Sequence, residues 1–498
     1  VTDVDEGGPD TTPPTVLSGP DSVLQTAPDR LTVQFSEAVT DTALETAAYT
    51  VVDADGNPAR VTSVDRINDS TVQINLAARL PNGDFTLTVD DTVEDLAGNA
   101  LTEPATLDFE VDAPTRVINV GPGDGDAMQS LDRKVFVEFD RAVDPATITA
   151  DSVQVIADGE PLDGRLTVSK NGQIVTFFPN GLLPAATQIR ITLDGETIAD
   201  TAGRLVDVDN DGADGGTLRS DFSTVTLTPV PNTNLEGFIY DSNNRGPNGE
   251  DLPLEGVIVT VIGLPGVQAV TDENGRFFLE DLPAPEVFLH FDASPVSAET
   301  GFEYGTIVKP GHTVAGQTVR MKTADGEPFD IYFAAIPEDD AVEIVPGEET
   351  VAGLGEFGLQ NLAETYPDID PAEWEKLKVT VPADSLFDDQ GEPAESLTIM
   401  AFEPDRIPAP TPAGFDPEVV FTVMGSGADN VDGKAQVEFP NLDGLPPGAK
   451  RPIMSFDHDA GEWVQTGTAI VSEDGSTLVS EGDTGVNTLG WKFVGDQP

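Results

Sequence analysis

The feature that most constrains the fold is a strand pattern that occurs twice in the first half of the chain. Residues 31–39 read LTVQFSEAV and residues 135–143 read VFVEFDRAV, an offset of 104. The DLAG sequence at residues 95–98 returns as DTAG at residues 200–203, an offset of 105. Repetition of separate blocks at nearly constant spacing predicts two tandem domains. The alternation of apolar and polar residues predicts strands with one buried face.

The rest of the sequence also has the composition of an all-β protein. Gly (48 residues) and Pro (40 residues) punctuate short alternating segments, and frequent turn residues between strands are typical of β-sandwiches. A chain of 498 residues is long enough for several domains. We therefore predict an all-β fold of four tandem β-sandwich domains.

The repeated pair resembles the bacterial Ig-like domain found in S-layer proteins. The resemblance rests on the strand end F-[SD]-x-A-V and on the D-x-A-G turn, and it covers residues 13–228. It implies Ig-like domains at residues 15–112 and 113–228, after an acidic linker at residues 1–14. It also implies a cell-surface or secreted setting.

The second copy contains an aspartate-rich loop, DVDNDGADGG, that the first copy lacks. Asp207, Asp209 and Asp211 alternate along this loop, a Gly follows the third, and Asp214 comes shortly after. Calcium takes roughly 6–8 oxygen ligands, and D-x-D-x-D-G supplies three carboxylates from one short turn. The loop is not an EF-hand, because its twelfth position is Leu218 rather than Glu. We predict a Ca²⁺ site made by the four aspartates with carbonyl groups or water; the alternative is a solvated acidic loop.

Residues 229–325 carry a different set of strand motifs, which include LEGVIVTV at residues 254–261 and TDENGRF at residues 271–277. These motifs resemble the carboxypeptidase regulatory-like domain family. The resemblance implies a transthyretin-like sandwich that is an accessory domain without catalytic residues. We consider a second metal site in the acidic loop at residues 241–251, whose ligand spacing is irregular; the alternative is a loop that binds no metal. The next strand, residues 329–333, is assigned to the following domain.

Residues 326–498 are predicted to form a larger β-sandwich with one short helix. Asp370 followed by Pro371 marks the start of that helix. The phrases FPNLDGLPPG at residues 439–448 and SFDHDAGEW at residues 455–463 resemble the β-sandwich module that precedes the shell in bacterial YD-repeat proteins and teneurins. This resemblance implies an alternative function as the N-terminal support or plug of a YD-repeat toxin or surface protein.

The net charge of the chain disfavours some classes of binding partner and favours others. Asp and Glu number 89 against 25 Lys and Arg, so the net charge is −64. A field of this sign repels nucleic acids and anionic lipids and attracts divalent cations. The chain has no cysteine and no apolar run of membrane-spanning length, so we expect neither disulfides nor membrane insertion. We expect an extracellular protein, secreted or attached to the cell surface. Its expected partners are neighbouring domains of a longer chain and cell-surface or self-assembly partners.

No catalytic motif stands out in the sequence. The histidines His290, His312 and His458 lie outside any H-E-x-x-H, and there is no cysteine nucleophile. His458 lies between two aspartates and is interpreted as a turn residue. We therefore predict a non-catalytic scaffold, a calcium-stabilised stalk or spacer of an adhesin-like or S-layer-like protein. The YD-repeat support is the alternative, and an enzyme with an unrecognised site is a remote one.

Because most of this charge must face solvent, added salt should stabilise the protein. The Debye length falls from about 10 Å at 0.1 M to about 3 Å at 1 M ionic strength, which screens repulsion between exposed carboxylates. Raising NaCl over this range in EDTA should therefore raise the melting temperature in differential scanning calorimetry. A flat or falling melting temperature would show that the surface charge is already paired locally.

Overall fold

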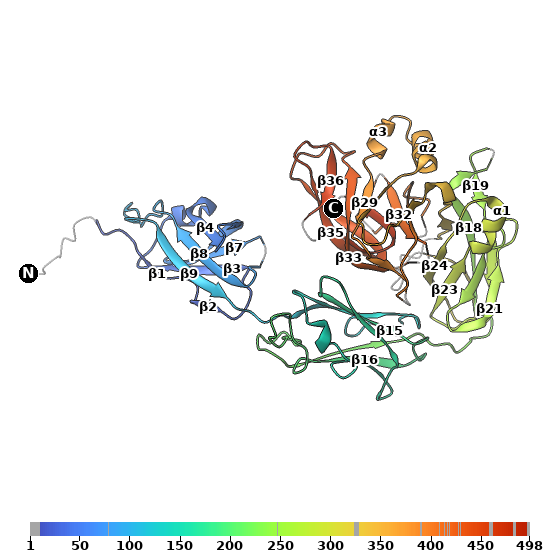
Figure 1. Cartoon of the computed structure of the whole chain (residues 1–498), viewed down its shortest axis with the longest axis horizontal. Coiled ribbons are helices and arrows are strands. Elements are labelled where there is room, and N and C mark those ends of the chain that lie inside the picture. Colours follow the sequence, from blue (N-terminus) through green and yellow to red (C-terminus); the bar gives the residue numbers. More distant parts are fainter. Residues whose placement is uncertain are drawn as a thin grey trace, which may run out of the picture. The chain divides into compact units, whose positions relative to one another are not determined.

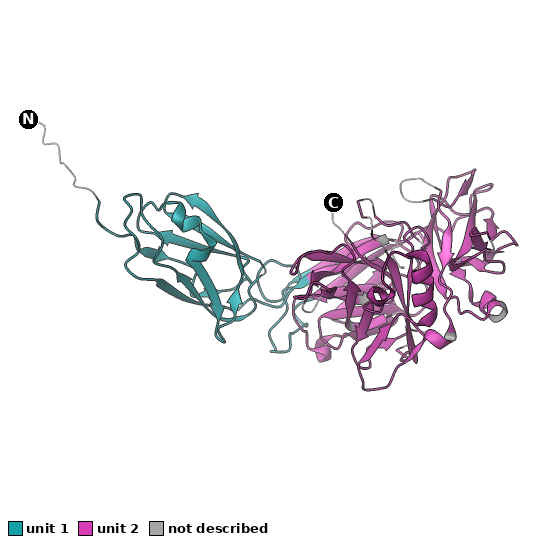
Figure 2. Ribbon diagram, turned by 90° about the horizontal axis from the view of Figure 1, so that it is seen from above, with its two compact units in different colours: residues 1–117, 194–217 teal, residues 118–193, 218–498 magenta. Residues whose placement is uncertain are grey.

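The structure, a computed structural model, falls into two compact units (Figure 2). Unit 1 comprises residues 1–117 and 194–217, and unit 2 comprises residues 118–193 and 218–498. The structure describes residues 10–77, 79–246, 248–322, 328–388, 391–407, 409–412, 414–415, 417, 419–426, 428, 430–457, 462–481 and 485–495.

Unit 1 contains the first Ig-like sandwich, whose two sheets have the strand orders β1–β3–β7–β6 and β2–β9–β8–β4–β5 (Figure 1). In β3, Leu31, Val33 and Phe35 are at most 2% exposed, whereas the residues between them face solvent. Strand β2 lies parallel to β9, and the other pairings are antiparallel. The elements are β1 (Val16–Ser18), β2 (Val23–Leu24), β3 (Arg30–Phe35), η1 (Asp41–Leu44), η2 (Thr46–Ala48), β4 (Tyr49–Asp53), β5 (Pro58–Ala59), β6 (Val61–Asn68), β7 (Thr71–Leu76), β8 (Gly83–Val89) and β9 (Ala105–Val111).

The second Ig-like domain repeats this plan, with its two sheets almost wholly in unit 2. The strand orders are β10–β11–β15–β14 and β13–β12–β16–β17. Strand β11 pairs with β15 as β3 pairs with β7 in the first copy. The elements are β10 (Val117–Gly121), β11 (Val135–Phe139), η3 (Pro145–Thr147), β12 (Val153–Ala157), β13 (Glu160–Pro161), β14 (Gly164–Val168), β15 (Ile174–Pro179), β16 (Gln188–Asp194) and β17 (Thr217–Ser223).

The third domain is a sandwich organised around the long strand β18. One sheet joins β18 to β19, β22, β25 and β26, and the other has the order β21–β20–β23–β24. Strands β25 and β26 run parallel to β18. The elements are β18 (Asn234–Arg245), β19 (Asp251–Pro253), β20 (Ile258–Val261), β21 (Leu264–Val270), β22 (Arg276–Leu279), β23 (Glu286–Asp292), α1 (Ser294–Thr300), β24 (Thr306–His312), β25 (Thr318–Arg320) and β26 (Ile331–Phe333).

The assignment of residues 329–333 to the fourth domain is wrong. Strand β26 within them pairs with β18, with Ile331 opposite Ile239, and its side chains belong to the core of the third domain. The third sandwich therefore extends past the predicted boundary at residue 325.

The fourth domain is built on one 12-stranded sheet with the order β27–β31–β32–β38–β34–β35–β36–β33–β29–β28, while β30 and β37 pair with β33. A bridge from Leu354, which follows β28, to Ile399 of β31 brings the two ends of this order close together. The strands contribute to one large core cluster and to a second cluster that they share with the third domain. The elements are η4 (Glu338–Asp340), β27 (Val342–Glu343), β28 (Thr350–Gly353), α2 (Glu356–Thr365), α3 (Pro371–Trp374), β29 (Lys378–Val381), β30 (Leu386–Phe387), β31 (Ser396–Phe402), β32 (Val420–Gly425), β33 (Asn430–Pro440), β34 (Lys450–Asp457), β35 (Glu462–Val471), β36 (Thr477–Ser480), β37 (Val486–Thr488) and β38 (Gly490–Val494).

The predicted helix is confirmed as α3, where the Asp370 side chain accepts the Ala372 N–H and Pro371 occupies the first turn. Trp374 of α3 is fully buried. The sequence did not predict the longer helix α2, which contains Gly358 and has no side-chain cap.

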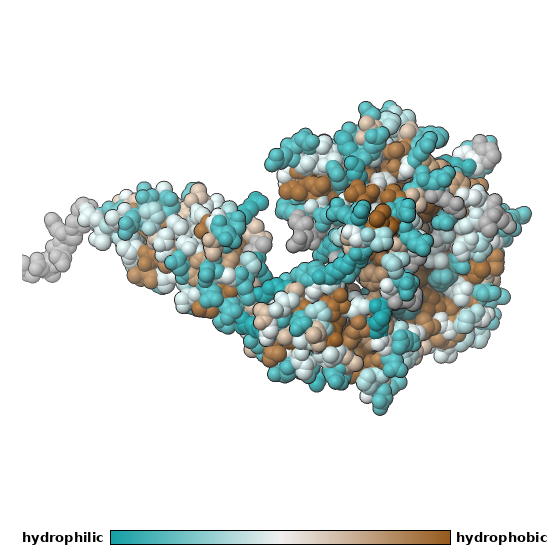
Figure 3. All heavy atoms as spheres, in the orientation of Figure 1, coloured by the Kyte–Doolittle hydropathy of each residue, from teal (hydrophilic) through white to brown (hydrophobic). Residues whose placement is uncertain are grey.

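Hydrophilic residues cover much of the molecular face in Figure 3, as the charge predicts, with smaller apolar areas between them.

The repeated strand should be a main source of stability in the second Ig-like domain. Phe139 of β11 is 0% exposed, and replacing a buried Phe by Ala costs about 3–5 kcal/mol through lost burial and a residual cavity. Phe139→Ala should lower the unfolding free energy of this domain by that amount in urea titration. Leu182→Ala is the control, because Leu182 is 53% exposed and surface changes stay within about 0.5 kcal/mol. Equal effects of the two variants would contradict the assigned core.

Candidate metal centres

The first candidate centre is the loop cluster, formed by Asp207, Asp209 and Asp211. It lies in unit 1, in the segment between β16 and β17. One carboxylate oxygen from each aspartate lies within 4.8 Å of the others. The alternating spacing therefore does bring three of the four predicted ligands together.

The backbone of the loop turns tightly around the side chain of Asp207. Its two carboxylate oxygens accept N–H bonds from Asp211 (3.2 Å) and Gly212 (3.0 Å). Asn210 adopts a left-handed φ of 59° and its side-chain amide donates to the Val117 carbonyl at 3.0 Å. Asp207 is only 2% exposed, so the turn holds one carboxylate inside and leaves the other two at the surface.

Asp214, the fourth predicted ligand, does not join the loop cluster. The Arg204 Nε lies 2.8 Å from the Asp214 Oδ1, and the Arg204 Nη1 lies 2.6 Å from the Asp112 Oδ1. Asp214 is therefore ion-paired with Arg204. Three of the four predicted ligands, Asp207, Asp209 and Asp211, lie together.

The electrostatics of the loop cluster penalise its negative charge. Burial raises the pKa of Asp207, and the negative charge of Asp209 adds to the rise, although N–H bonds from Gly212, Asp211 and Asn210 act against it. Both raising effects penalise the ionised carboxylate. A divalent cation beside Asp207 would remove this penalty.

The Asp209 carboxylate lies where a side chain on Gly216 would otherwise be. A Cβ on Gly216 would lie 2.4 Å from the Asp209 Oδ2, and Gly216 has a φ of 81°. Only glycine fits here without moving the Asp209 carboxylate. The geometry of the loop cluster therefore depends on a residue outside the D-x-D-x-D-G motif.

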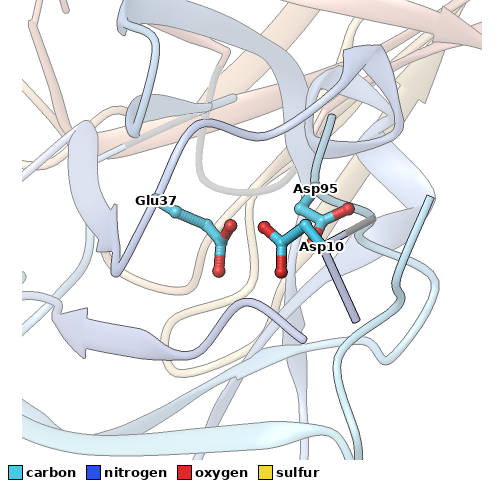
Figure 4. Close-up of side chains that lie close together, drawn as sticks. All are labelled: Asp10, Glu37 and Asp95. Atoms are coloured by element: carbon cyan, nitrogen blue, oxygen red, sulfur yellow. The ribbon is translucent and has the colours of Figure 1, made fainter. Parts of the chain in front are cut away.

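A second candidate centre, the turn cluster, unites Asp10, Glu37 and Asp95 in unit 1 (Figure 4). Asp10 precedes β1, Glu37 follows β3, and Asp95 begins the D-x-A-G turn. One carboxylate oxygen of each lies within 4.8 Å of the others. The sequence did not predict this cluster, because its members are far apart along the chain.

Asp95 is the fixed member of the turn cluster and is 1% exposed. Its Oδ1 accepts the N–H groups of Ala97 (2.8 Å) and Asn99 (2.9 Å), and its Oδ2 accepts the Asn99 side-chain amide (2.8 Å). Burial, followed by the charges of Asp10 and Asp95, raises the pKa of Glu37. The carboxylates of the turn cluster therefore also repel one another, as those of the loop cluster do.

Both clusters offer the oxygen ligands that Ca²⁺ prefers. Neither contains the imidazole or thiolate groups typical of zinc sites. His312 Nδ1 is instead 2.8 Å from a Glu286 carboxylate oxygen, and His458 lies outside the described residues. Three carboxylates alone do not complete a Ca²⁺ shell, so carbonyl groups or water must supply the rest.

A hollow of about 410 Å³ lies on the first Ig-like domain. Its lining contains acidic and aromatic side chains but neither histidine nor cysteine, so it lacks the usual base and thiol nucleophile. The lining residues are Ser22, Ala54, Asp84, Phe85, Thr86, Asp108, Phe109 and Glu110.

Comparison with protein families agrees with the repeat. Residues 10–111 and 110–224 each match the family described as bacterial Ig-like domain. The chain therefore carries two tandem bacterial Ig-like domains. The comparison with curated proteins gives no match. Within the described residues, no helix is long and apolar enough to cross a membrane.

Solved structures give only distant similarity. Domains 1–6 of the surface layer protein SbsC are 11% identical, covering 98% of this chain and 67% of that chain with a TM-score of 0.19. Alpha-2-macroglobulin from Escherichia coli, domains MG0-NIE-MG1, is 14% identical, covering 55% and 93% with a TM-score of 0.24. An L,D-transpeptidase from Mycobacterium smegmatis is 15% identical, covering 45% and 91% with a TM-score of 0.18. TM-scores this low carry no argument about function.

Turn aspartates should make unit 1 sensitive to acid. Hydrogen bonds from the Asn57 side chain and backbone lower the pKa of Asp53. At Asp95 burial acts to raise the pKa, but hydrogen bonds from Asn99 and from the turn backbone outweigh it, so the pKa is lowered. A carboxyl with a lowered folded pKa stabilises the protein above its unfolded pKa of about 3.9, and this stabilisation disappears as pH falls through the folded pKa.

The turns of Asp53 and Asp95 should therefore lose stability as pH falls below about 4, whereas the raised pKa values of Asp207 and Glu37 act in the opposite direction. Asp53→Asn should melt with a shallower pH dependence than the wild type, as followed by calorimetry at several pH values. Asp55→Asn, which changes a neighbouring exposed aspartate, serves as the control. Identical pH profiles for wild type and Asp53→Asn would contradict the proposed role of this turn.

Proposed function

We propose that the chain is a non-catalytic structural segment of a bacterial surface or secreted protein. It acts as a stalk or spacer in which Ca²⁺ stabilises the Ig-like domains. The main support is the tandem pair of bacterial Ig-like domains, which contain two separate groups of three carboxylates whose oxygen atoms lie within 4.8 Å of one another. The net charge of −64 favours divalent cations and disfavours nucleic acids as partners.

The two Ig-like copies carry different residues at the position after the D-x-A-G turn, Asn99 in the first and Arg204 in the second. This difference supports a cation at the turn cluster. The residue after each D-x-A-G turn binds the segment that leads into its own domain. In the first copy the Asn99 side-chain amide donates to the Asp10 carbonyl at 3.2 Å. In the second copy the Arg204 Nη1 donates to the Asp112 carbonyl at 2.8 Å. Arg204 brings a positive charge to its carboxylates, whereas Asn99 brings none to the turn cluster.

The later domains support an accessory role without defining a ligand. We propose that the third domain is of the carboxypeptidase regulatory-like type and that the fourth is the module found before YD-repeat shells. In the fourth, the Asn441 side-chain amide donates to the carbonyls of Leu445 (2.9 Å) and Gly475 (2.8 Å). The FPNLDGLPPG phrase thus stabilises a loop. Support of a YD-repeat shell is the second candidate function, favoured by this phrase and its neighbours.

Calcium should stabilise the loop cluster through Asp209. A ligand that binds only the native state stabilises it by about 2.7 kcal/mol at a hundredfold excess over Kd. Millimolar Ca²⁺ should therefore raise the melting temperature above its value in EDTA. Asp209→Asn should melt at or above the wild-type temperature in EDTA, because a repulsive charge beside Asp207 is gone. The same variant should melt below the wild type in Ca²⁺.

A glycine pair provides the matched control. Gly216→Ala places a Cβ 2.4 Å from the Asp209 Oδ2, whereas Gly212→Ala meets only the Thr26 methyl at 3.8 Å. Both residues have a left-handed φ, of 81° and 90°, so the backbone cost is similar. Gly216→Ala should lose more Ca²⁺ affinity in isothermal titration calorimetry. If the wild type melts identically in EDTA and Ca²⁺, calcium has no stabilising role.

A further inference from the structure

We infer that the end of β18 and the start of β19 form a receptor for a guanidinium cation, which Arg406 of the fourth domain supplies. These residues belong to the acidic stretch 241–251, in which we considered a second metal site from the sequence. The occupant of the receptor is a side chain of the same chain, so the third and fourth domains should unfold as one unit. This inference is independent of calcium binding by the Ig-like domains.

Arg406 is enclosed by oxygen atoms of the third domain. Its Nε donates to the Ser242 carbonyl (2.8 Å), and its Nη2 donates to the carbonyls of Asp241 (2.5 Å) and Asn244 (3.2 Å). Its Nη1 donates to a carboxylate oxygen of Asp251. Three carbonyls and one carboxylate thus form a set of oxygen acceptors, and oxygen atoms are also the ligands that hard cations prefer.

The receptor is preorganised by the buried side chain of Asp241, which is 0% exposed. Its Oδ1 accepts the N–H groups of Asn243 (2.8 Å) and Asn244 (2.7 Å). Its Oδ2 accepts the Tyr304 hydroxyl at 2.6 Å. These bonds fix the backbone whose carbonyls bind Arg406, which reduces the entropy lost when the two domains meet.

A guanidinium group suits this receptor better than an ammonium group. Its planar donors reach several acceptors at once, and it stays protonated at any physiological pH. The Arg406 guanidinium also lies 5.1 Å from the Tyr332 ring centroid, within cation–π range. Arg406 is 2% exposed, so removing it would leave buried carbonyls without a partner.

Apolar contacts surround this polar connection. Ala334 and Ile336, which follow β26, share one core cluster with Phe402, Ile407 and Trp491 of the fourth domain. Phe302 of the third domain and Phe357 of α2 also pack together, with ring centroids 5.2 Å apart. The apolar cluster buries surface of both domains, and the hydrogen bonds of Arg406 fix how the two domains are aligned with each other.

The test compares Arg406→Ala with Arg245→Ala in the full chain. Arg245 also reaches across to the fourth domain, where it pairs with Glu403, but its side chain is 41% exposed. Calorimetry in EDTA should show one shared transition for domains three and four in the wild type and in Arg245→Ala. In Arg406→Ala this transition should split or shift down by about 5 °C or more.

Chemical rescue distinguishes a receptor from general packing. About 20 mM guanidinium chloride, far below denaturing concentrations, should raise the melting temperature of Arg406→Ala, whereas equal NaCl should not. Arg406→Lys should still melt below the wild type, because the ammonium group of lysine cannot reach all the acceptors that the guanidinium group binds. A wild-type melting profile for Arg406→Ala, or equal effects of guanidinium and sodium, would overturn the inference.

Hydrogen exchange of the wild type provides a test that does not depend on a variant folding. Amides of residues 239–245 should exchange with the same opening free energy as those of residues 396–402. Earlier opening of the first segment would also overturn the inference, because the two domains would then open separately.

Discussion

The excess of carboxylates over basic side chains governs how this protein is built. With 89 acidic and 25 basic residues, most carboxylates have no ion-pair partner available. Many take hydrogen bonds from the backbone instead. Asp53, Asp95 and Asp272 each begin a five-residue turn and accept N–H bonds from the second and fourth residues that follow. The acidic composition is therefore partly a requirement of the turns that connect the strands.

Three of the basic residues bind where segments distant in sequence meet. Arg204 joins the D-x-A-G turn to the segment before its domain through the carbonyl and carboxylate of Asp112. Lys170 of the second Ig-like domain donates to the Ala383 carbonyl of the fourth domain at 2.6 Å. Arg406 binds three carbonyls of the third domain. Bonds to carbonyl groups do not compete for the carboxylates, so one cation can join segments and also pair with an acid.

The sequence predicted what depends on local pattern and missed what depends on distant contacts. The repeat placed Phe35 and Phe139 at equivalent core positions, since alternation alone decides which face of a strand is buried. The loop cluster was predictable because its members lie within five residues of one another. Asp214 lies outside the loop cluster, where it pairs with Arg204, a contact that the spacing of the aspartates did not reveal. The turn cluster and the pairing of β26 arise from tertiary contacts that no single motif encodes.

The parallel pairing of β26 with β18 has a mechanical consequence. The chain enters the third domain through β18 and leaves it through β26, and the two strands point the same way. Tension on the two ends of the domain would pull these strands past each other lengthwise, so the bonds between them would share the load in shear rather than break one by one. Strands β2 and β9, near the two ends of the first domain, are also parallel. This geometry makes both domains resistant to extension along the chain.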